Sequence, residues 1–193
     1  MTKYYQELML LPVSDVNNNF LWKKVFKQIH LALVENKIGQ NVSSIGIGFP
    51  EYNAKEYCLG RKLRLFAQDQ ITLEQLKCGV WLNRLKDYVY SGSICLVPAK
   101  VQGYACFKQI KPKSSKERLA RRRAKRKGET LEQALLSYQD FKEQRSSLPY
   151  LTMVSETTGQ NFRLFIEKEL VQEPYEGNFS CYGLSHQSTI PLF

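Results

Sequence analysis

The sequence predicts an α+β protein with two domains, residues 1–98 and 99–193. Strand and helix patterns follow one another in the order βαββαβ through the N-terminal part, which is typical of a ferredoxin-like, split βαβ sheet. The C-terminal part contains instead an arginine-rich helix, 114–128, and a β-hairpin, 150–167. With 193 residues, of which 43% are hydrophobic, the chain is long enough to bury a core.

Hydrophobic periodicity defines the N-terminal elements. A helix from Phe20 to about Asn36 has apolar residues at helical spacing, and His30 lies at the margin of its apolar stripe. A turn of three asparagines, 17–19, offers an N-cap for this helix, and Asp69 caps a second helix that runs through Leu85. Strands are predicted over 4–11, 43–49, 62–67 and 88–97.

The C-terminal elements alternate in the same way. A strand is predicted over 101–110, and a helix from Thr130 to Phe141 follows the arginine-rich helix. The two arms of the hairpin, 150–155 and 162–167, flank a turn at 156–160. A short strand over 178–185 leads into a polar tail.

The positive charge of the chain is concentrated around the arginine-rich helix. Between Lys108 and Lys127 there are eleven basic residues and one acidic residue, so this window accounts for the whole net charge of +10. Ser114 and Glu117 have the spacing of a capping box, and Gly128 suits a left-handed C-terminal end. Cations on every side of a helix predict that it stays out of its own domain and binds a polyanion such as nucleic acid. A solvated basic face or a localisation signal would be a blander explanation.

Several other classes of function are disfavoured by composition. The five cysteines are widely spaced without a CxxC pair, which predicts reduced core residues, and two histidines with four scattered aspartates predict no metal site. No phosphate-binding glycine motif indicates a nucleotide cofactor. The N-terminus lacks signal-peptide architecture and the chain has no run of about 18 apolar residues, so we expect a cytoplasmic protein without a membrane span.

Five segments together resemble one known family. They are FKQIHLALV at 26–34, IGIGFP at 45–50, ERLARRRAKR at 117–126, SETTGQNFRLFI at 155–166 and SCYGLS at 180–185. In this order they are similar to the type I-F CRISPR repeat-processing endoribonucleases, and the likeness extends over nearly the whole chain. The hairpin and the terminal segment are its most specific parts.

The resemblance implies a metal-independent endoribonuclease that needs no cofactor. It implies cleavage at the 3′ base of a repeat stem-loop by attack of a ribose 2′-OH, which leaves a cyclic phosphate and a 5′-OH. The catalytic histidine of the family falls on His30, its serine that orients the 2′-OH on Ser155, its active-site tyrosine on Tyr182, and its stacking phenylalanine on Phe162. The implied partners are CRISPR repeat RNA, kept as the 3′ handle, and other subunits of the type I-F surveillance complex. Histidine suits the role of general base because its ordinary pKa lies near neutral pH.

The same resemblance assigns RNA contacts to the basic segment. Arg122, Lys125 and Arg126 match the positions that contact phosphate and base, while backbone contacts are expected from Arg118, Arg121, Arg123 and Lys127. Lys113 is also expected among the RNA-binding residues. The family usually has Arg and Gln reading the lowest base pairs of the stem, where this chain has Gln109 and Lys111. A slip of one residue would place Lys108 there instead. Because Gln suits adenine and Lys suits guanine, we hypothesise altered purines at the base of the cognate stem.

Other functions remain open at the level of sequence. The chain could be a non-catalytic RNA hairpin-binding protein in which His30 is structural. A basic DNA-binding or membrane-surface module is a third interpretation. His186 is the alternative base, although it lies in the polar tail.

Overall fold

The computed structural model describes all residues except 1, 13–15, 57, 113–115, 142–145 and 156–157. The fold is α+β with antiparallel sheets, as predicted, and it divides into two compact units. The larger unit comprises residues 1–110 and 148–193, and the smaller unit comprises residues 111–147. These units differ from the two sequence domains, whose boundary after residue 98 stays a prediction.

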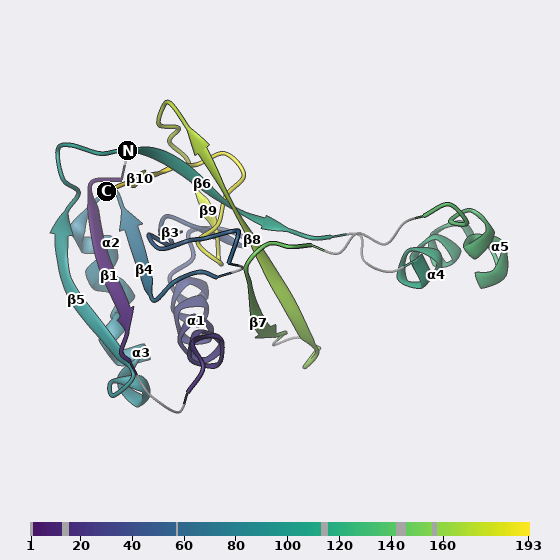
Figure 1. The fold of residues 1–193 in the computed structure, drawn as a ribbon, viewed down its shortest axis with the longest axis horizontal. Helices are drawn as coiled ribbons and strands as arrows, with labels where there is room; N and C mark the ends of the chain where they lie inside the picture. Colours follow the sequence, from purple (N-terminus) through teal and green to yellow (C-terminus); the bar gives the residue numbers. More distant parts are fainter. Residues whose placement is uncertain (1, 13–15, 57, 113–115, 142–145, 156–157) are drawn as a thin grey trace. The chain divides into compact units, whose positions relative to one another are not determined.

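The first sheet of the larger unit has four antiparallel strands (Figure 1). Its spatial order is β3 (Gly46–Gly48), β4 (Lys62–Ala67), β1 (Tyr4–Leu10) and β5 (Val89–Leu96). The strands that are first and third in the βαββαβ order thus lie side by side at the centre, which is compatible with a ferredoxin-like domain. The register pairs Leu8 with Leu63, and both side chains are fully buried.

The helices of this unit follow from their caps and apolar faces. Helix α1 (Asn18–Glu35) begins at Asn17, whose side chain accepts a hydrogen bond from the backbone of Asn19 at 2.8 Å. Helix α2 (Gln70–Leu76) begins at Asp69 as predicted, but it ends at Lys77 in a left-handed conformation. The predicted continuation to Leu85 is therefore broken into α3 (Cys78–Trp81) and the 3₁₀ helix η1 (Asn83–Leu85).

A second antiparallel sheet belongs to the same unit. Its order is β10 (Ile190–Leu192), β6 (Gly103–Ile110), β8 (Asn161–Val171) and β7 (Tyr150–Val154). Strand β10 lies in the tail that the sequence predicts to be merely polar, and this prediction is wrong. Ser188 and Thr189 are buried there because their hydroxyls donate to the carbonyl oxygens of Asn178 and Tyr175.

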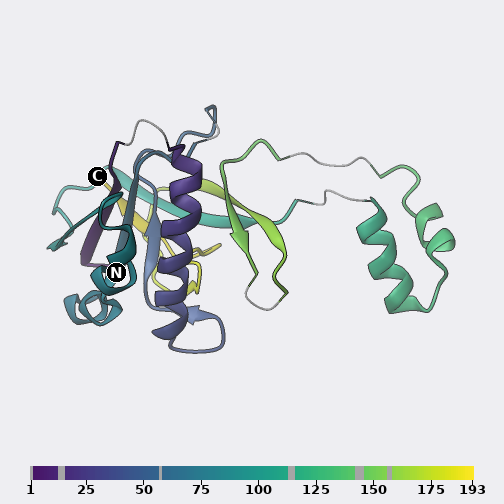
Figure 2. The same cartoon turned by 90° about the horizontal axis from the view of Figure 1, so that it is seen from below.

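One hydrophobic core joins the two sheets and α1. Phe49, which follows β3, lies with its ring centroid 5.8 Å from that of Phe107 on β6 and 6.0 Å from that of Trp22 on α1. Figure 2 shows α1 alongside the hairpin formed by β7 and β8, and α1 packs against β7. Two further short strands, β2 (Val42–Ser43) and β9 (Phe179–Ser180), pair with each other. The core thus fixes α1, the hairpin and the C-terminal segment in one unit.

The smaller unit consists of two helices, α4 (Lys116–Lys127) and α5 (Leu131–Leu136). Gly128 has a φ of 67°, which confirms the predicted left-handed end of α4. Helix α5 begins at Thr130 with a capping box and is shorter than the predicted helix to Phe141. The predicted N-cap of α4, Ser114, lies outside the described residues.

The cysteines are all free thiols, but they are not all core residues. Cys78, Cys106 and Cys181 are buried as predicted. Cys95, however, is exposed on β5, and Cys58 is half-buried in a loop. On β5, Cys95 and its neighbour Leu96 are both exposed, so this end of the strand does not contribute to the core.

Candidate active site

The structure brings together two of the three predicted catalytic residues, His30 and Tyr182. His30 is half-buried on α1, at the margin of the apolar face as predicted. Its ring stacks on that of Tyr182, with 4.2 Å between the centroids and 10° between the planes. The two residues are far apart in the sequence, and the segment after β9 brings Tyr182 onto α1.

A backbone carbonyl fixes the tautomer of His30. The Nδ1 atom lies 2.8 Å from the carbonyl oxygen of Cys181. Because a carbonyl oxygen only accepts hydrogen bonds, Nδ1 must carry the proton in the neutral ring. The basic lone pair of neutral His30 is therefore on Nε2, and the ring is oriented both by a hydrogen bond and by a stacked aromatic side chain.

The carbonyl of Cys181 belongs to a tight turn, Ser180–Leu184, which we call the terminal turn. The backbone N–H of Ser180 donates to Leu184 O at 2.9 Å, and that of Gly183 donates to Ser180 O at 2.7 Å. The turn is attached to the first sheet because the N–H of Ile47 donates to Gly183 O at 2.8 Å. The turn is thus held by β3 through a hydrogen bond other than the one to His30.

Two glycines allow this close attachment. Gly183 has a φ of 69°, and a Cβ atom there would lie 2.4 Å from Cγ1 of Ile47. Before the turn, the ring of Phe179 covers Gly46 so closely that a Cβ on Gly46 would lie 2.5 Å from it. The sequence SCYGLS contains a signal for this arrangement, since glycine is favoured where φ is positive. The sequence nevertheless does not reveal the role of the Cys181 carbonyl, because every residue has a backbone carbonyl and no side-chain pattern marks this one.

Burial keeps the other titratable groups of the terminal turn neutral. It raises the pKa of the Tyr182 phenol above its usual value, and the neighbouring Cys181 raises it further. Burial also raises the pKa of the Cys181 thiol, which the positive charge of Lys37 partly opposes. At neutral pH the site therefore presents a protonated phenol, which is a hydrogen-bond donor.

The third predicted residue, Ser155, directly follows β7 and closes the hairpin. Its backbone N–H donates to Gln160 O at 2.9 Å, and its Oγ accepts from the N–H of Thr158 at 3.2 Å. A hydroxyl that accepts in this way keeps its own proton for donation. Because β7 packs on α1, the hairpin that contains Ser155 is attached to the helix that contains His30.

Phe162, the predicted stacking residue, lies on β8 opposite Met153. Its side chain is half-buried and packs partly against the core. Its remaining surface is exposed, and its role as a stacking residue stays a prediction.

Helix α4 of the smaller unit contains several of the predicted RNA-binding residues. Leu119, Ala120 and Ala124 face inward, and α4 packs against α5. One narrow face of α4 is thus small and apolar and packs on α5, whereas the rest of the predicted domain belongs to the larger unit. The basic residues that α4 exposes between Lys116 and Lys127 are Arg118, Arg121, Arg122, Lys125, Arg126 and Lys127.

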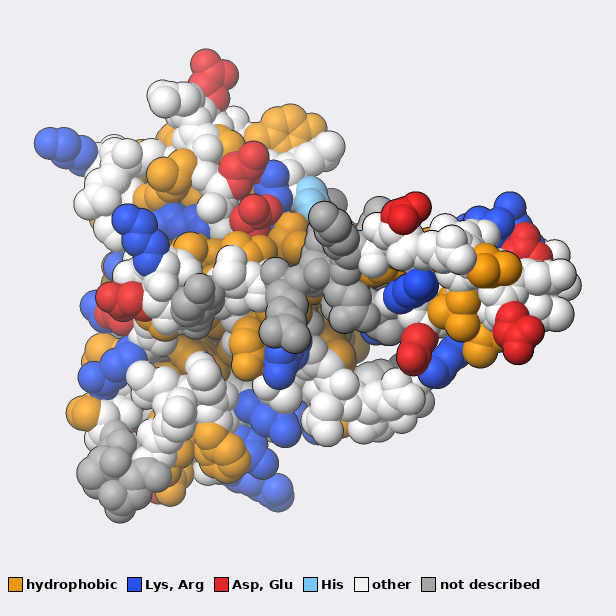
Figure 3. Space-filling view, turned by 45° about the vertical axis from the view of Figure 1, so that its right-hand side comes forward, with side chains coloured by type: hydrophobic (Ala, Val, Ile, Leu, Met, Phe, Trp, Pro, Cys, Tyr) orange, Lys and Arg blue, Asp and Glu red, His pale blue; other side chains and the backbone are white. Residues whose placement is uncertain are grey.

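Acidic residues partner some of these cations. Arg123 is less exposed and binds Glu129 through two hydrogen bonds, Nε to Oε2 at 2.8 Å and Nη2 to Oε1 at 3.3 Å. Arg121 lies 3.5 Å from Glu117, but both side chains are more than 70% exposed, so this pair is weak. Figure 3 accordingly shows basic, acidic and apolar side chains on the visible face of this helical unit.

The residues predicted to read the base of the stem lie at the end of β6. Gln109 is half-buried within the strand, and Lys111 is exposed just after it. Lys108, the alternative, forms an ion pair with Glu169 of β8. Lys113 lies outside the described residues.

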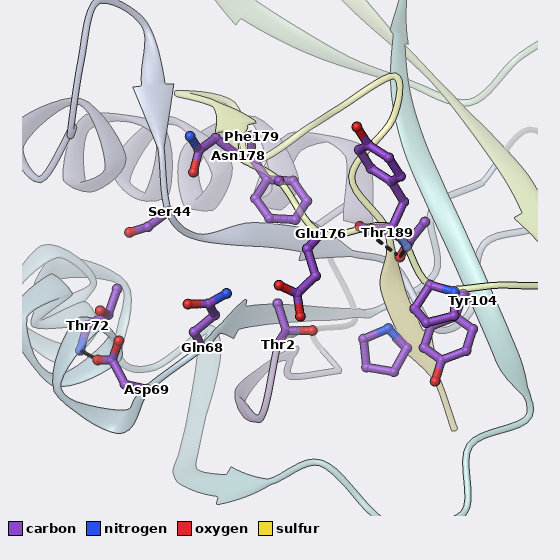
Figure 4. Close-up of a pocket in the computed structure, with 14 residues that line it drawn as sticks. Thr2, Ser44, Gln68, Asp69, Thr72, Tyr104, Glu176, Asn178, Phe179 and Thr189 are labelled. Carbon is purple, nitrogen blue, oxygen red and sulfur yellow. Dashed lines mark hydrogen bonds between the residues drawn. The ribbon is translucent and has the colours of Figure 1, made fainter.

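A pocket elsewhere in the larger unit has a cavity volume of about 320 Å³ (Figure 4). None of the predicted site residues lines it. Asp69 and Glu176 are among its lining residues, together with Gln68 and Asn178. Two carboxyl groups disfavour an RNA phosphate, so this pocket is not a candidate for RNA binding.

In the described part of the chain, no three His, Cys, Asp or Glu residues form a group that could hold a metal ion. No described helix is long and apolar enough to span a membrane.

The fold and the site define an α+β protein with a histidine held in a two-sheet unit and a separate basic helical unit. Comparison with known proteins gives the family. Residues 5–193 match the family model described as "CRISPR-associated protein (Cas_Csy4)". The chain therefore belongs to the Cas_Csy4 family.

Two curated relatives are both named "CRISPR-associated endonuclease Cas6/Csy4". The relative from Escherichia coli (strain UTI89 / UPEC) is 35% identical over 191 residues. The relative from Pseudomonas aeruginosa (strain UCBPP-PA14) is 33% identical over 191 residues. In both comparisons the match covers 98% of this chain and 99% of the relative.

Proposed function

We propose that this chain is an endoribonuclease that processes CRISPR repeat RNA, with His30 as the general base. The membership of the Cas_Csy4 family and the names of the two relatives support an endonuclease. The observation that carries the assignment of the base is the hydrogen bond from His30 Nδ1 to the Cys181 carbonyl. This bond places the basic nitrogen on the opposite side of a ring that Tyr182 holds in place.

The proposed reaction uses this basic nitrogen on the RNA itself. Nε2 of His30 takes the proton of a ribose 2′-OH, and the 2′-oxygen attacks the adjacent phosphorus. The bond to the 5′-oxygen breaks, which gives a 2′,3′-cyclic phosphate and, after protonation of the leaving oxygen, a 5′-OH. The Ser155 hydroxyl orients the attacking ribose. The ring of Tyr182 stacks on the imidazole of His30, and its phenol donates a hydrogen bond to the phosphate.

Metal independence is part of this proposal. A 2′-OH within the substrate is already adjacent to the phosphorus, so the reaction needs a base and a donor rather than a metal-bound water. Charge that develops on the phosphate would be met by hydrogen-bond donors and by cations of the protein.

We further propose that α4 binds the stem of a repeat hairpin. Arg122, Lys125 and Arg126 are exposed on one face, where they can reach phosphates and base edges, whereas Arg123 would have to leave Glu129 to do so. A short hairpin suits this binding because the major groove of RNA opens near a loop or a helix end. Retention of the hairpin as a 3′ handle within a type I-F surveillance complex follows from the family resemblance.

The reading of the stem base by Gln109 and Lys111 also remains a proposal. The ion pair of Lys108 with Glu169 favours it, because the alternative residue is already engaged. Exchange of the lowest base pairs of the cognate stem for the order usual in the family should weaken binding. Equal affinity for both RNAs would contradict this assignment.

The direct test of the proposed base is His30→Ala. We expect the variant to bind the repeat hairpin as the wild-type protein does and to cleave it about 10²–10⁴-fold more slowly, the usual contribution of a general acid or base. Binding by gel shift and single-turnover cleavage would be measured on the same RNA, with His186→Ala as the matched control. Unchanged cleavage by His30→Ala would point to another base. If the wild type and both variants bind the hairpin tightly but none of them cleaves it, the chain is instead a non-catalytic hairpin-binding protein.

A further inference from the structure

Helix α1 carries a row of basic side chains that continues the site along the protein surface. Successive residues of an α-helix are 100° apart, so Lys23 lies about 20° and Lys27 about 60° from His30 around the helix axis. Along the axis they are about 10 Å and about 5 Å from His30. Lys23, Lys27 and His30 therefore form one stripe, which we call the α1 stripe.

The burial pattern shows that this stripe is a defined face rather than a general solvated surface. Lys23, Lys27 and His30 are all half-buried, although Lys23 lies about 120° and Lys27 about 160° around the helix axis from the buried Ile29. Lys24, in contrast, points about 120° away from His30, is exposed, and places its ammonium 5.5 Å from the ring centroid of Phe20. The chemistry of α1 thus differs between these two faces.

The charged residues of α1 are also mostly basic. Glu35, at the C-terminal end, is the only acidic residue of the helix, and none lies between its first residue and His30. Beyond the helix, Lys37 acts electrostatically on the Cys181 thiol, so a further cation lies near the terminal turn. Outside the window from Lys108 to Lys127 the chain is neutral overall, which makes this local excess of cations notable.

We propose that the α1 stripe binds the phosphates of the single-stranded RNA segment on the 3′ side of the cut. This inference rests on the proposed function, because it takes His30 as the place of the scissile phosphate. The strand that leaves that phosphate in the 3′ direction has no base-paired partner, so it can extend along a protein surface. Lys23 and Lys27 continue directly from His30 at distances that suit successive phosphates. Lysines bind such phosphates as point charges, without sequence preference.

The test compares binding of uncleavable RNAs, each with a 2′-deoxy sugar before the cut. One hairpin ends at the cut, a second continues with a single-stranded 3′ arm, and a third has a 5′ arm instead. We expect the wild-type protein to bind the RNA with the 3′ arm most tightly. Lys23→Gln/Lys27→Gln should lose this gain, on the order of tenfold at low salt, and should bind the hairpin without an arm as the wild type does.

Two controls separate charge from folding. Lys23→Arg/Lys27→Arg should retain the gain from the 3′ arm, and Lys24→Gln should behave as the wild type. The slope of log affinity against log salt for the RNA with the 3′ arm should fall by about 1.4 in the double Gln variant, because two single-strand phosphate contacts are lost.

Three results would overturn the inference. They are equal weakening of all three RNAs by the double Gln variant, a gain from the 5′ arm alone, or no gain from either arm. If the wild-type protein does not bind the hairpin that ends at the cut, the proposed function itself fails, and the inference fails with it. Normal hairpin binding without a gain from the 3′ arm rejects only the inference.

Discussion

At the scale of single residues, the site depends on how the imidazole of His30 is held. The Cys181 carbonyl accepts a hydrogen bond from the imidazole, and the ring of Tyr182 stacks on it. An aromatic pair contributes about 0.5–1.5 kcal/mol beyond its buried area, which is enough to favour one ring orientation. Of the two contacts, only the stacked ring belongs to a side chain and can be removed by substitution.

Substitution of Tyr182 should separate stacking from hydrogen bonding. Tyr182→Phe keeps a ring on His30 but lacks the phenol, whereas Tyr182→Ala loses both. We expect both variants to bind the hairpin, and we expect Tyr182→Ala to cleave it more slowly than Tyr182→Phe. The measurement is single-turnover cleavage at saturating protein. If the two variants cleaved at equal rates, the stacked ring would have no positioning role.

The residue types of the site were visible in the sequence, but their partners were not. His30 could be placed at a helix margin by periodicity, and the structure confirms this position. Its hydrogen-bond partner lies 151 residues away and is a backbone carbonyl, which no sequence pattern specifies. The contact of His30 with Tyr182 likewise depends on the pairing of β2 with β9.

At the scale of elements, the terminal turn links the first sheet to the site. Gly183 requires a positive φ and lies against Ile47, so its conformation and its packing both exclude a side chain. Gly159, in the hairpin, has nearly the same φ, 66°, but a Cβ there would have no atom of the described residues within 4 Å. These two glycines therefore form a matched pair.

Alanine at these glycines should have unequal effects. Both substitutions incur the strain of a left-handed residue, of order 1–3 kcal/mol, and only Gly183→Ala adds a collision with Ile47. We expect Gly183→Ala to lower the free energy of unfolding by more than Gly159→Ala. Chemical denaturation of the two variants measures this difference. Equal losses would show that the turn moves away from β3 without cost.

Helix α4 ends with an ion pair whose stability effect depends on pH. The hydrogen bonds from Arg123 lower the pKa of Glu129 below its usual value. A carboxyl group whose pKa is lower in the folded state stabilises that state above its unfolded pKa, and this contribution is lost as pH falls through the folded pKa. Glu129→Gln should therefore reduce helix content on heating at pH 7, and the two proteins should converge in acid. Circular dichroism at both pH values measures this, and a constant difference would contradict the assigned cause.

Elements with strong local signals were predicted well, and elements fixed by distant partners were not. Strand β4 has the predicted bounds, and β1 and α1 differ from theirs by one or two residues. The second helix was predicted too long because Lys77, a good helix former, adopts a left-handed conformation there. Strand β10 was missed because its three residues become a strand only by pairing with β6.

At the scale of the whole molecule, the excess charge and the candidate base belong to different compact units. Most of the basic window lies in the helical unit, whereas His30, Tyr182 and Ser155 lie in the larger unit. Under the proposed function, RNA binding by α4 and the chemistry at His30 belong to separate parts of one chain. A loss of cations on α4 should weaken binding, while a change at His30 should slow cleavage of RNA that is still bound.

The measurement that tests the central claim most directly is cleavage of the cognate repeat hairpin in EDTA. It is made beside the same RNA with a 2′-deoxy sugar at the nucleotide before the cut. The account predicts that cleavage persists in EDTA, yields a cyclic phosphate, and disappears with the deoxy sugar while binding remains. Cleavage of the deoxy RNA would contradict 2′-OH attack with His30 as the base. So would cleavage of the unmodified RNA that stops in EDTA and recovers on addition of Mg²⁺.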